Sequence, residues 1–189
     1  MRNTAFLLLG LGLLVLQSQL FRVVGVVAAT CRELLGPLAA WWVAGMTPSL
    51  LVPLIVYLGV HEYSLARGAL LSFALGYLLD VVASAPLGLF TFISVSIFLI
   101  ARGAGVRMAA QTVLTKMALA FAFALLQGFV LVVLVAIFGG DAARSRALAS
   151  LLLPHAISTA LLAPPVFALT QRVDLATVAA PRPAEVARR

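Results

Sequence analysis

Charged residues are scarce in this chain. Of its 189 residues, 10% are Asp, Glu, Lys or Arg and 63% are hydrophobic, which gives a mean hydropathy of +1.15. Soluble domains carry roughly 25% charged residues, so the chain lacks the polar surface that a water-soluble globule needs. A membrane span needs about 20 apolar residues, and six spans would use roughly 120. The composition therefore excludes a soluble enzyme and leaves no room for a separate soluble domain.

Cysteine and acidic residues are also few. Cys31 is the single cysteine, so an internal disulfide cannot form and a secreted disulfide scaffold is excluded. Six acidic residues stand against 13 Lys and Arg, which gives a net charge of +7. These cations lie at the ends of apolar runs, as is typical of loops and a tail that flank membrane spans and meet anionic lipid. We therefore expect no nucleic-acid binding.

Motifs of known catalytic sites are missing as well. His61-Glu62 begins like the helix of a zinc protease, but Leu65 stands where the second histidine would be needed. The sequence contains no Gly-x-Ser-x-Gly turn, no phosphate-binding loop and no Cys-His cluster. We predict no enzyme activity, no cofactor and no metal site.

Long apolar runs, bounded by charge, Gly and Pro, are what the chain does contain, and they predict an all-α polytopic membrane protein with a six-helix transmembrane bundle. The first run also resembles a signal sequence or the approach to a lipid anchor at Cys31, but its apolar character resumes after Arg22, which favours a retained span. The segment 32–46, with its tandem Trp41 and Trp42, is typical of an interfacial element. The predicted spans are 4–27, 48–60, 68–83, 87–100, 112–138 and 148–170.

The predicted transmembrane domain covers residues 1–173, and a basic tail, residues 174–189, is predicted to be disordered and cytoplasmic. Six spans place nine of the 13 Lys and Arg residues on the side of the termini. Because cytoplasmic loops carry the excess of Lys and Arg, both termini are predicted to be cytoplasmic. The nine cations are Arg2, Arg67, Arg102, Arg107, Lys116, Arg172, Arg182, Arg188 and Arg189.

The third predicted span carries a stripe of small residues. Gly68, Ser72 and Gly76 recur every four residues, and Asp80 and Ser84 follow at the same spacing. In lipid, small residues at this spacing let a second helix approach closely. Two interpretations are open: packing against another helix of this chain, or a docking face for the helix of a partner protein.

Asp80 is the only acidic residue well inside an apolar run. A membrane carboxylate is costly and is by default a functional residue, so proton or ion coupling is one interpretation. The other is structural, because Ser84, Pro86 and Gly88 belong to a turn that opens the fourth span, with Ser84 suited to the N-cap and Pro86 to the first helical turn. A carboxylate beneath that turn can accept its free backbone N–H groups, which find no water in lipid. We favour this capping role.

His155 follows Pro154 near the start of the sixth span, at a depth close to that of Asp80. We predict that His155 and Asp80 lie near each other in the bundle interior. A lone buried histidine is more often a core residue than a ligand, and the sequence offers no partners for a metal site here.

A Gly-rich span that ends in Leu79-Asp80 and a next span that opens with Pro86-Leu87-Gly88 together resemble the MreD family of bacterial rod-shape-determining membrane proteins. The resemblance covers residues 4–172, and Phe90 is a departure, since the family often has His there. The family is also similar in fold to the six-helix S-components of energy-coupling-factor vitamin transporters. Other features that agree with the family are Gln17, Pro48, Pro53, Pro154 and Pro164.

The resemblance implies a non-enzymatic scaffold subunit of the cell-elongation complex in the bacterial cytoplasmic (inner) membrane, which supports peptidoglycan synthesis and cell-shape control. The implied partners are the single-span protein MreC and, through it, RodA, a penicillin-binding protein and the MreB cytoskeleton. The stripe formed by Gly68, Ser72 and Gly76 is the predicted contact for a partner helix. The alternative is an S-component-like carrier that binds a small molecule or a lipid precursor. Its pocket would draw on Thr91, Ser94, Ser96, Gln127 and His155.

Overall fold

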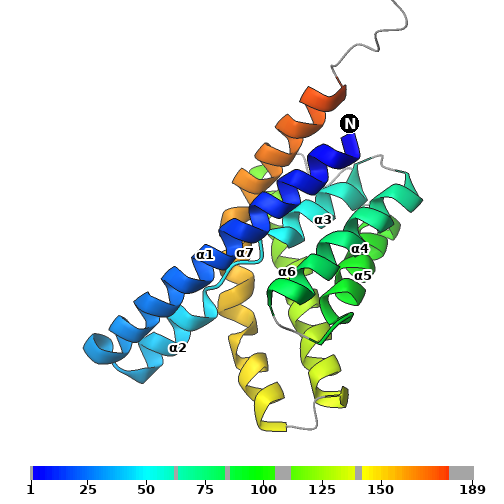
Figure 1. Ribbon diagram of the computed structural model, residues 1–189. Coiled ribbons are helices and arrows are strands. Elements are labelled where there is room, and N and C mark those ends of the chain that lie inside the picture. Colours follow the sequence, from blue (N-terminus) through cyan, green and yellow to red (C-terminus); the bar gives the residue numbers. More distant parts are fainter. Residues whose placement is uncertain (1, 62–63, 84–85, 105–111, 139–141, 179–189) are drawn as a thin grey trace, which may run out of the picture.

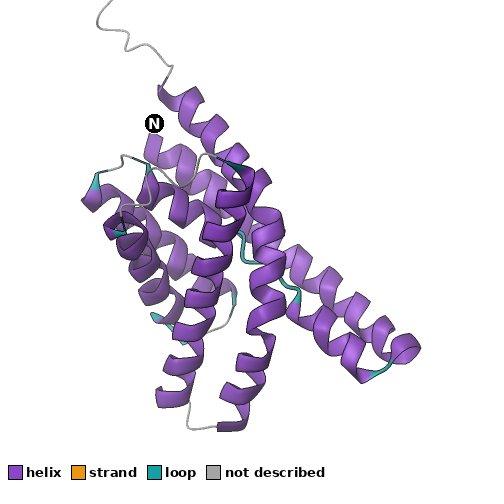
Figure 2. Cartoon of the chain, turned by 180° about the vertical axis from the view of Figure 1, so that it is seen from behind, coloured by secondary structure: helices purple, strands orange, loops and turns teal. Residues whose placement is uncertain are grey.

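This computed structural model describes residues 2–61, 64–83, 86–104, 112–138 and 142–178. All regular secondary structure in these ranges is helical, as Figure 2 shows. The all-α prediction is confirmed. The helices are α1 (Arg2–Leu35), α2 (Pro37–Gly45), α3 (Leu51–Val60), α4 (Leu65–Val82), α5 (Leu89–Gly103), α6 (Val113–Phe138) and α7 (Ala142–Val178).

Four of these helices are long and apolar enough to cross a membrane: α1, α4, α6 and the part of α7 from Ser145 to Thr177. The apolar helices α3 and α5 are shorter, with 10 and 15 residues. At about 1.5 Å per residue, α3 reaches about 15 Å, which is half of a hydrocarbon core about 30 Å thick. The chain is therefore an all-helical membrane protein with four helices of spanning length, while the six-span bundle stays a prediction.

The first and last helices of the described residues are longer than the sequence predicts. α1 continues past residue 27 to Leu35, and the chain then reverses at Gly36. Gly36 has a φ of 90°, a backbone conformation that would be strained in a residue with a side chain. α7 runs without a break to Val178 although three prolines lie inside it. The helix thus passes the domain boundary predicted at residue 173. Residues 179–189 of the predicted tail lie outside the described ranges.

The second part of α1 and the whole of α2 form a helical arm (residues 20–45) that projects from the rest of the molecule (Figure 1). The two helices pack against each other, and α2 also contacts α7. The approach to α7 is close, since a Cβ on Gly45 would lie 2.5 Å from the Cγ of Pro154. Exposed apolar side chains cover the arm, among them Phe21, Val23, Val26, Leu34, Leu35 and Leu38.

α3 lies inside the bundle. All ten of its residues are buried, and the helix packs against α1, α4, α5, α6 and α7. A helix that is enclosed on every side needs apolar residues all round, which is what the sequence from Leu51 to Val60 provides. The core around it includes the fully buried rings of Phe6, Phe98 and Phe167.

The small-residue stripe of α4 faces α5 of the same chain. A Cβ on Gly76 would lie 2.6 Å from the Cα of Thr91 and 2.8 Å from the carbonyl oxygen of Phe90, and a Cβ on Gly68 would overlap the ring of Phe98. The prediction of a partner-docking face at this stripe does not fit the structure, because α5 already fills it. The stripe residues, all buried, are Gly68, Ser72 and Gly76.

Candidate functional site

Residues 46–50, between α2 and α3, are not helical, and residues 48–50 are buried. A non-helical stretch among membrane helices is stable only where its backbone N–H and C=O groups find partners within the protein. Two of these N–H groups bond to side chains of other helices. Gln17 Oε1 on α1 accepts from Leu50 N–H at 3.0 Å, and Thr159 Oγ1 on α7 accepts from Ser49 N–H at 3.0 Å.

His155 on α7 binds a backbone carbonyl of the same stretch. Its Nδ1 lies 2.5 Å from the carbonyl oxygen of Thr47. Because a carbonyl oxygen can only accept, Nδ1 carries the proton, and Nε2 of the neutral ring is an acceptor. In the described part of the chain His155 and Asp80 form no hydrogen bond with each other, since each side chain bonds elsewhere, and their predicted proximity stays a prediction.

Asp80, near the end of α4, holds the start of α5. Its fully buried carboxylate accepts from the backbone N–H groups of Gly88 (3.0 Å), Phe90 (2.7 Å) and Thr91 (3.1 Å), and from the Thr91 hydroxyl (2.6 Å). The first N–H groups of a helix have no partner within the helix, and a negative charge beside them is also favoured by the helix dipole. Both oxygens of Asp80 are therefore engaged inside the chain.

The turn before α5 differs in detail from the sequence prediction. The N-cap is Gly88, with a φ of 97°, so Pro86 precedes the helix instead of lying in its first turn. Glycine has no side chain that could cap the helix, and the acceptor comes from Asp80 on the preceding helix instead. Ser84, predicted for the N-cap, lies outside the described residues.

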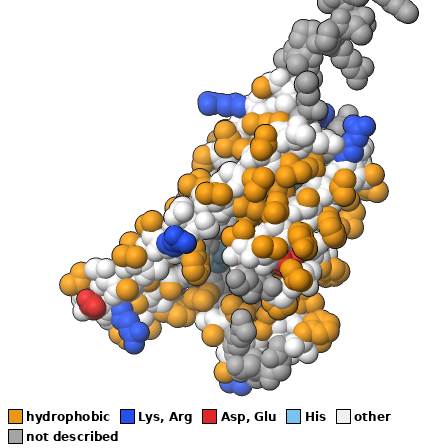
Figure 3. Space-filling view, in the orientation of Figure 1, with side chains coloured by type: hydrophobic (Ala, Val, Ile, Leu, Met, Phe, Trp, Pro, Cys, Tyr) orange, Lys and Arg blue, Asp and Glu red, His pale blue; other side chains and the backbone are white. Residues whose placement is uncertain are grey.

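A cavity of about 320 Å³ lies beside residues 46–50, between the arm and helices α4 to α7. A second hollow, of about 500 Å³, shares part of this lining and reaches Arg22 at the base of the arm. Figure 3 shows the arm standing away from the rest of the molecule with this hollow between them. The lining of both is mainly apolar, and its polar members are Gln17, Ser18, Arg22, Thr47, Ser49, Gln127 and His155.

Two polar atoms at this cavity are buried and have no hydrogen-bond partner within the described part of the chain: Oε1 of Gln127 and Oγ of Ser49. The two residues are 8% and 2% exposed. An unpaired buried acceptor costs about 1–3 kcal/mol. Sequence reasoning named Gln127 as a polar residue in an apolar run but missed Ser49, because a serine at the end of a run carries no local signal of burial.

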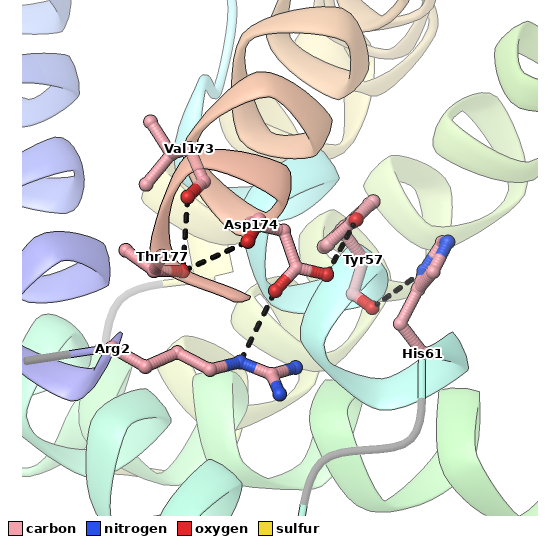
Figure 4. Close-up of polar contacts among 6 residues, drawn as sticks. All are labelled: Arg2, Tyr57, His61, Val173, Asp174 and Thr177. Carbon is pink, nitrogen blue, oxygen red and sulfur yellow. Dashed lines mark hydrogen bonds and ion pairs between the residues drawn. The ribbon is translucent and has the colours of Figure 1, made fainter. Parts of the chain in front are cut away.

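A second polar cluster ties together three segments of the chain (Figure 4). Arg2 Nε lies 3.1 Å from Asp174 Oδ1, and the Tyr57 hydroxyl donates to Asp174 Oδ2 at 3.1 Å. The ring of His61 stacks on Tyr57 with centroids 3.8 Å apart, and burial lowers the pKa of His61 below its ordinary value of 6.5. The cluster joins the start of α1, the end of α3 and the last part of α7. The start of the first helix and the end of the last helix therefore lie on the same side of the molecule.

No group of three His, Cys, Asp or Glu residues in the described ranges could hold a metal ion. The fold and these sites define an all-helical membrane protein whose buried polar groups mainly hold its own backbone. Residues 13–173 match the family of rod shape-determining protein MreD, and the chain belongs to that family. The resemblance seen in the sequence is thereby confirmed. No curated protein and no solved structure gives a significant match.

Proposed function

We propose that the protein is a non-enzymatic scaffold subunit of the cell-elongation complex. It binds the transmembrane helix of an MreC-like single-span protein and, through it, supports RodA, a penicillin-binding protein and the MreB cytoskeleton in peptidoglycan synthesis. The observation that carries this proposal is the match of residues 13–173 to a family of rod-shape-determining proteins. The apolar surface supports it, because a chain with little polar surface must recognise its partners mainly through helix faces.

The proposal includes a topology in the bacterial cytoplasmic membrane with six helices at membrane depth and both termini in the cytoplasm. α3 and α5 supplement the four spanning helices, since both are apolar and pack against them. The ion pair between Arg2 and Asp174 supports placing the start of α1 and the end of α7 on one side. The excess of Lys and Arg at the predicted inner ends of the spans supports the cytoplasm as that side.

The arm is the surface on which we place the partner helix, because α5 covers the stripe of α4. α1 and α6 bury 22% of their spanning windows, against 39% for α4 and α7, so they have more surface left for a partner. On the arm, Gly25 and Ala29 are exposed small residues four positions apart, and a Cβ on Gly25 would meet nothing within 4 Å. That spacing lets a second helix approach closely.

The test is recovery of a tagged MreC with this protein from membranes that express both. The variant Gly25→Leu is expected to lower MreC recovery at least fivefold at unchanged levels of this protein. Gly12→Leu is the matched control, because Gly12 lies on the same helix and is equally open. Equal recovery with both variants would contradict the arm as the contact, and no recovery with the unmodified protein would contradict the scaffold itself.

The second candidate, a carrier for a small molecule or a lipid precursor, is favoured by one observation, the cavity beside residues 46–50. Of the residues predicted to line its pocket, Gln127 and His155 do line that cavity. Thr91, however, donates to Asp80, and Ser94 packs between α4 and α5. A carrier predicts a stoichiometric bound substrate and no stable protein partner in native mass spectrometry of the protein extracted from its own membranes.

A further inference from the structure

The cavity beside residues 46–50 is lined by two buried residues with a polar atom that finds no hydrogen-bond partner in the described part of the chain. Oε1 of Gln127 is a carbonyl-type oxygen and can only accept, so the group missing from its environment is a hydrogen-bond donor. Oγ of Ser49 is unpaired at the same cavity. Nε2 of His155 is a third acceptor, because Nδ1 already donates to Thr47. An occupant that satisfies this cavity must bring hydroxyl or N–H groups.

The charge around the cavity is positive. Arg22 on the arm lines the adjoining hollow, and no acidic residue of the described ranges lines either hollow. The Arg22 side chain is exposed and forms no ion pair with a described acidic residue. A guanidinium favours phosphate as a partner, so the hydroxyl-bearing occupant that fits best also carries a phosphate.

The rest of the lining is apolar. It comes from the arm, from the end of α4 and from the facing sides of α6 and α7, and includes Leu14, Phe21, Leu79, Leu131 and Leu152. A bound water needs two to four polar partners. This wall offers such partners in few places, so water is poorly stabilised along most of it. The arm that borders the hollow is itself covered with exposed apolar side chains, so the hollow opens where acyl chains are its ordinary neighbours.

We propose that this cavity binds one anionic membrane lipid whose headgroup carries hydroxyls, with phosphatidylglycerol as its simplest representative. The glycerol hydroxyls donate to Gln127 and Ser49, the phosphate pairs with Arg22, and the acyl chains lie along the arm. This inference concerns the hollow that Ser18 and Arg22 line, whereas the scaffold role concerns Gly25 and Ala29 further along the arm.

The test is native mass spectrometry of the full chain in nanodiscs that contain phosphatidylglycerol and phosphatidylcholine in equal amounts. Phosphatidylcholine has a phosphate but neither hydroxyl donors nor a net negative charge, so the comparison tests both features that the proposal requires. We expect one retained phosphatidylglycerol per chain, in at least tenfold excess over phosphatidylcholine. Retention of both lipids in equal amounts, or of neither, would overturn the proposal without recourse to any variant.

Variants of two lining residues test whether the lipid binds in this cavity. Gln127→Leu and Arg22→Gln are each expected to lower phosphatidylglycerol retention about tenfold, which corresponds to about 1.4 kcal/mol. The matched controls Gln171→Leu and Arg172→Gln change exposed residues of α7 that line neither hollow, and should leave retention unchanged. Thermal unfolding of each variant reports whether it is folded. A folded Gln127→Leu protein that retains the lipid normally would place the lipid elsewhere.

Competition with glycerol 3-phosphate separates a lipid from a soluble ligand of the same chemistry. We expect millimolar glycerol 3-phosphate to leave the bound phosphatidylglycerol in place, because it lacks the acyl chains that contact the apolar wall. Displacement of the lipid by this compound would overturn the lipid assignment and identify the cavity as a site for a water-soluble phosphate ester.

Discussion

The backbone N–H of Leu50 donates to the side-chain oxygen of Gln17 across 3.0 Å, and in this way α1 holds the residue from which α3 starts. Leu50 follows a stretch without helical hydrogen bonds, so a side chain supplies the acceptor that a preceding turn of helix would otherwise supply. Gln17 thus stabilises the start of α3, a role that its position on an apolar helix does not predict.

Replacing Gln17 by Leu is expected to destabilise the protein by about 1–3 kcal/mol, because it leaves the N–H of Leu50 buried without an acceptor. Thermal unfolding in detergent measures the effect. The control is Gln171→Leu, whose side chain is exposed on α7 and whose loss should change stability by less than about 0.5 kcal/mol. Equal stability of the two variants would contradict the role of Gln17.

Asp80→Asn is expected to lower stability by at least about 2 kcal/mol. The amide keeps one acceptor oxygen but removes the charge and turns an NH₂ group toward the donors of Gly88, Phe90 and Thr91. Unfolding by denaturant in mild detergent gives the difference. Glu33→Gln, an exposed residue at the end of α1, is the control and should be neutral. A fully stable Asp80→Asn protein would contradict the capping role and favour proton or ion coupling as the role of Asp80.

Gly76→Ala is expected to cost about 1–3 kcal/mol, because its Cβ would meet the backbone of α5, which cannot move aside as a flexible side chain can. Gly12→Ala meets open space and should be neutral, or stabilising by up to about 1 kcal/mol, since alanine favours helix. The thermal midpoints of the two variants decide between internal packing and partner docking. A stable Gly76→Ala protein that fails to bind MreC would support docking on α4.

The stability of the protein is expected to fall as the pH drops below about 6.5. Burial lowers the pKa of His61 in the folded state, so the folded chain binds fewer protons than the unfolded chain between the two pKa values. The contribution of His61 is therefore complete above the ordinary pKa and declines as the pH falls toward the lowered one. Thermal midpoints between pH 8 and pH 5 should fall less in His61→Gln, and identical slopes would contradict the assignment.

Local signals explain what the sequence predicts well. Hydropathy alone identifies the four long helices and their membrane character, because each contains an extended, mostly apolar stretch. The turn after Asp80 is also local, since its donors Gly88, Phe90 and Thr91 lie within 11 residues of the carboxylate. Ser84 is the N-cap predicted from the sequence because serine commonly caps helices, whereas the helix starts after Gly88, which tolerates the positive φ found there.

Contacts between distant segments explain what the sequence does not predict. His155 and Thr159 reach residues 47 and 49 across more than 100 positions of chain, so no spacing rule connects them. A different reason explains why the arm was not predicted: the first span is predicted to end at residue 27, whereas the helix continues to Leu35, just before Gly36 and Pro37. The stripe of α4 has the same sequence pattern whether its neighbour belongs to this chain or to another.

The burial of α3 on all sides sets an order for the biogenesis of this protein. Its ten residues are too few to partition into the bilayer as an independent span, and α5, α6 and α7, which enclose it, are synthesised later. α3 is therefore fully enclosed only once α7 has been synthesised. A chain truncated before α7 leaves α3 partly unshielded, so we expect quality-control proteases of the membrane to degrade it.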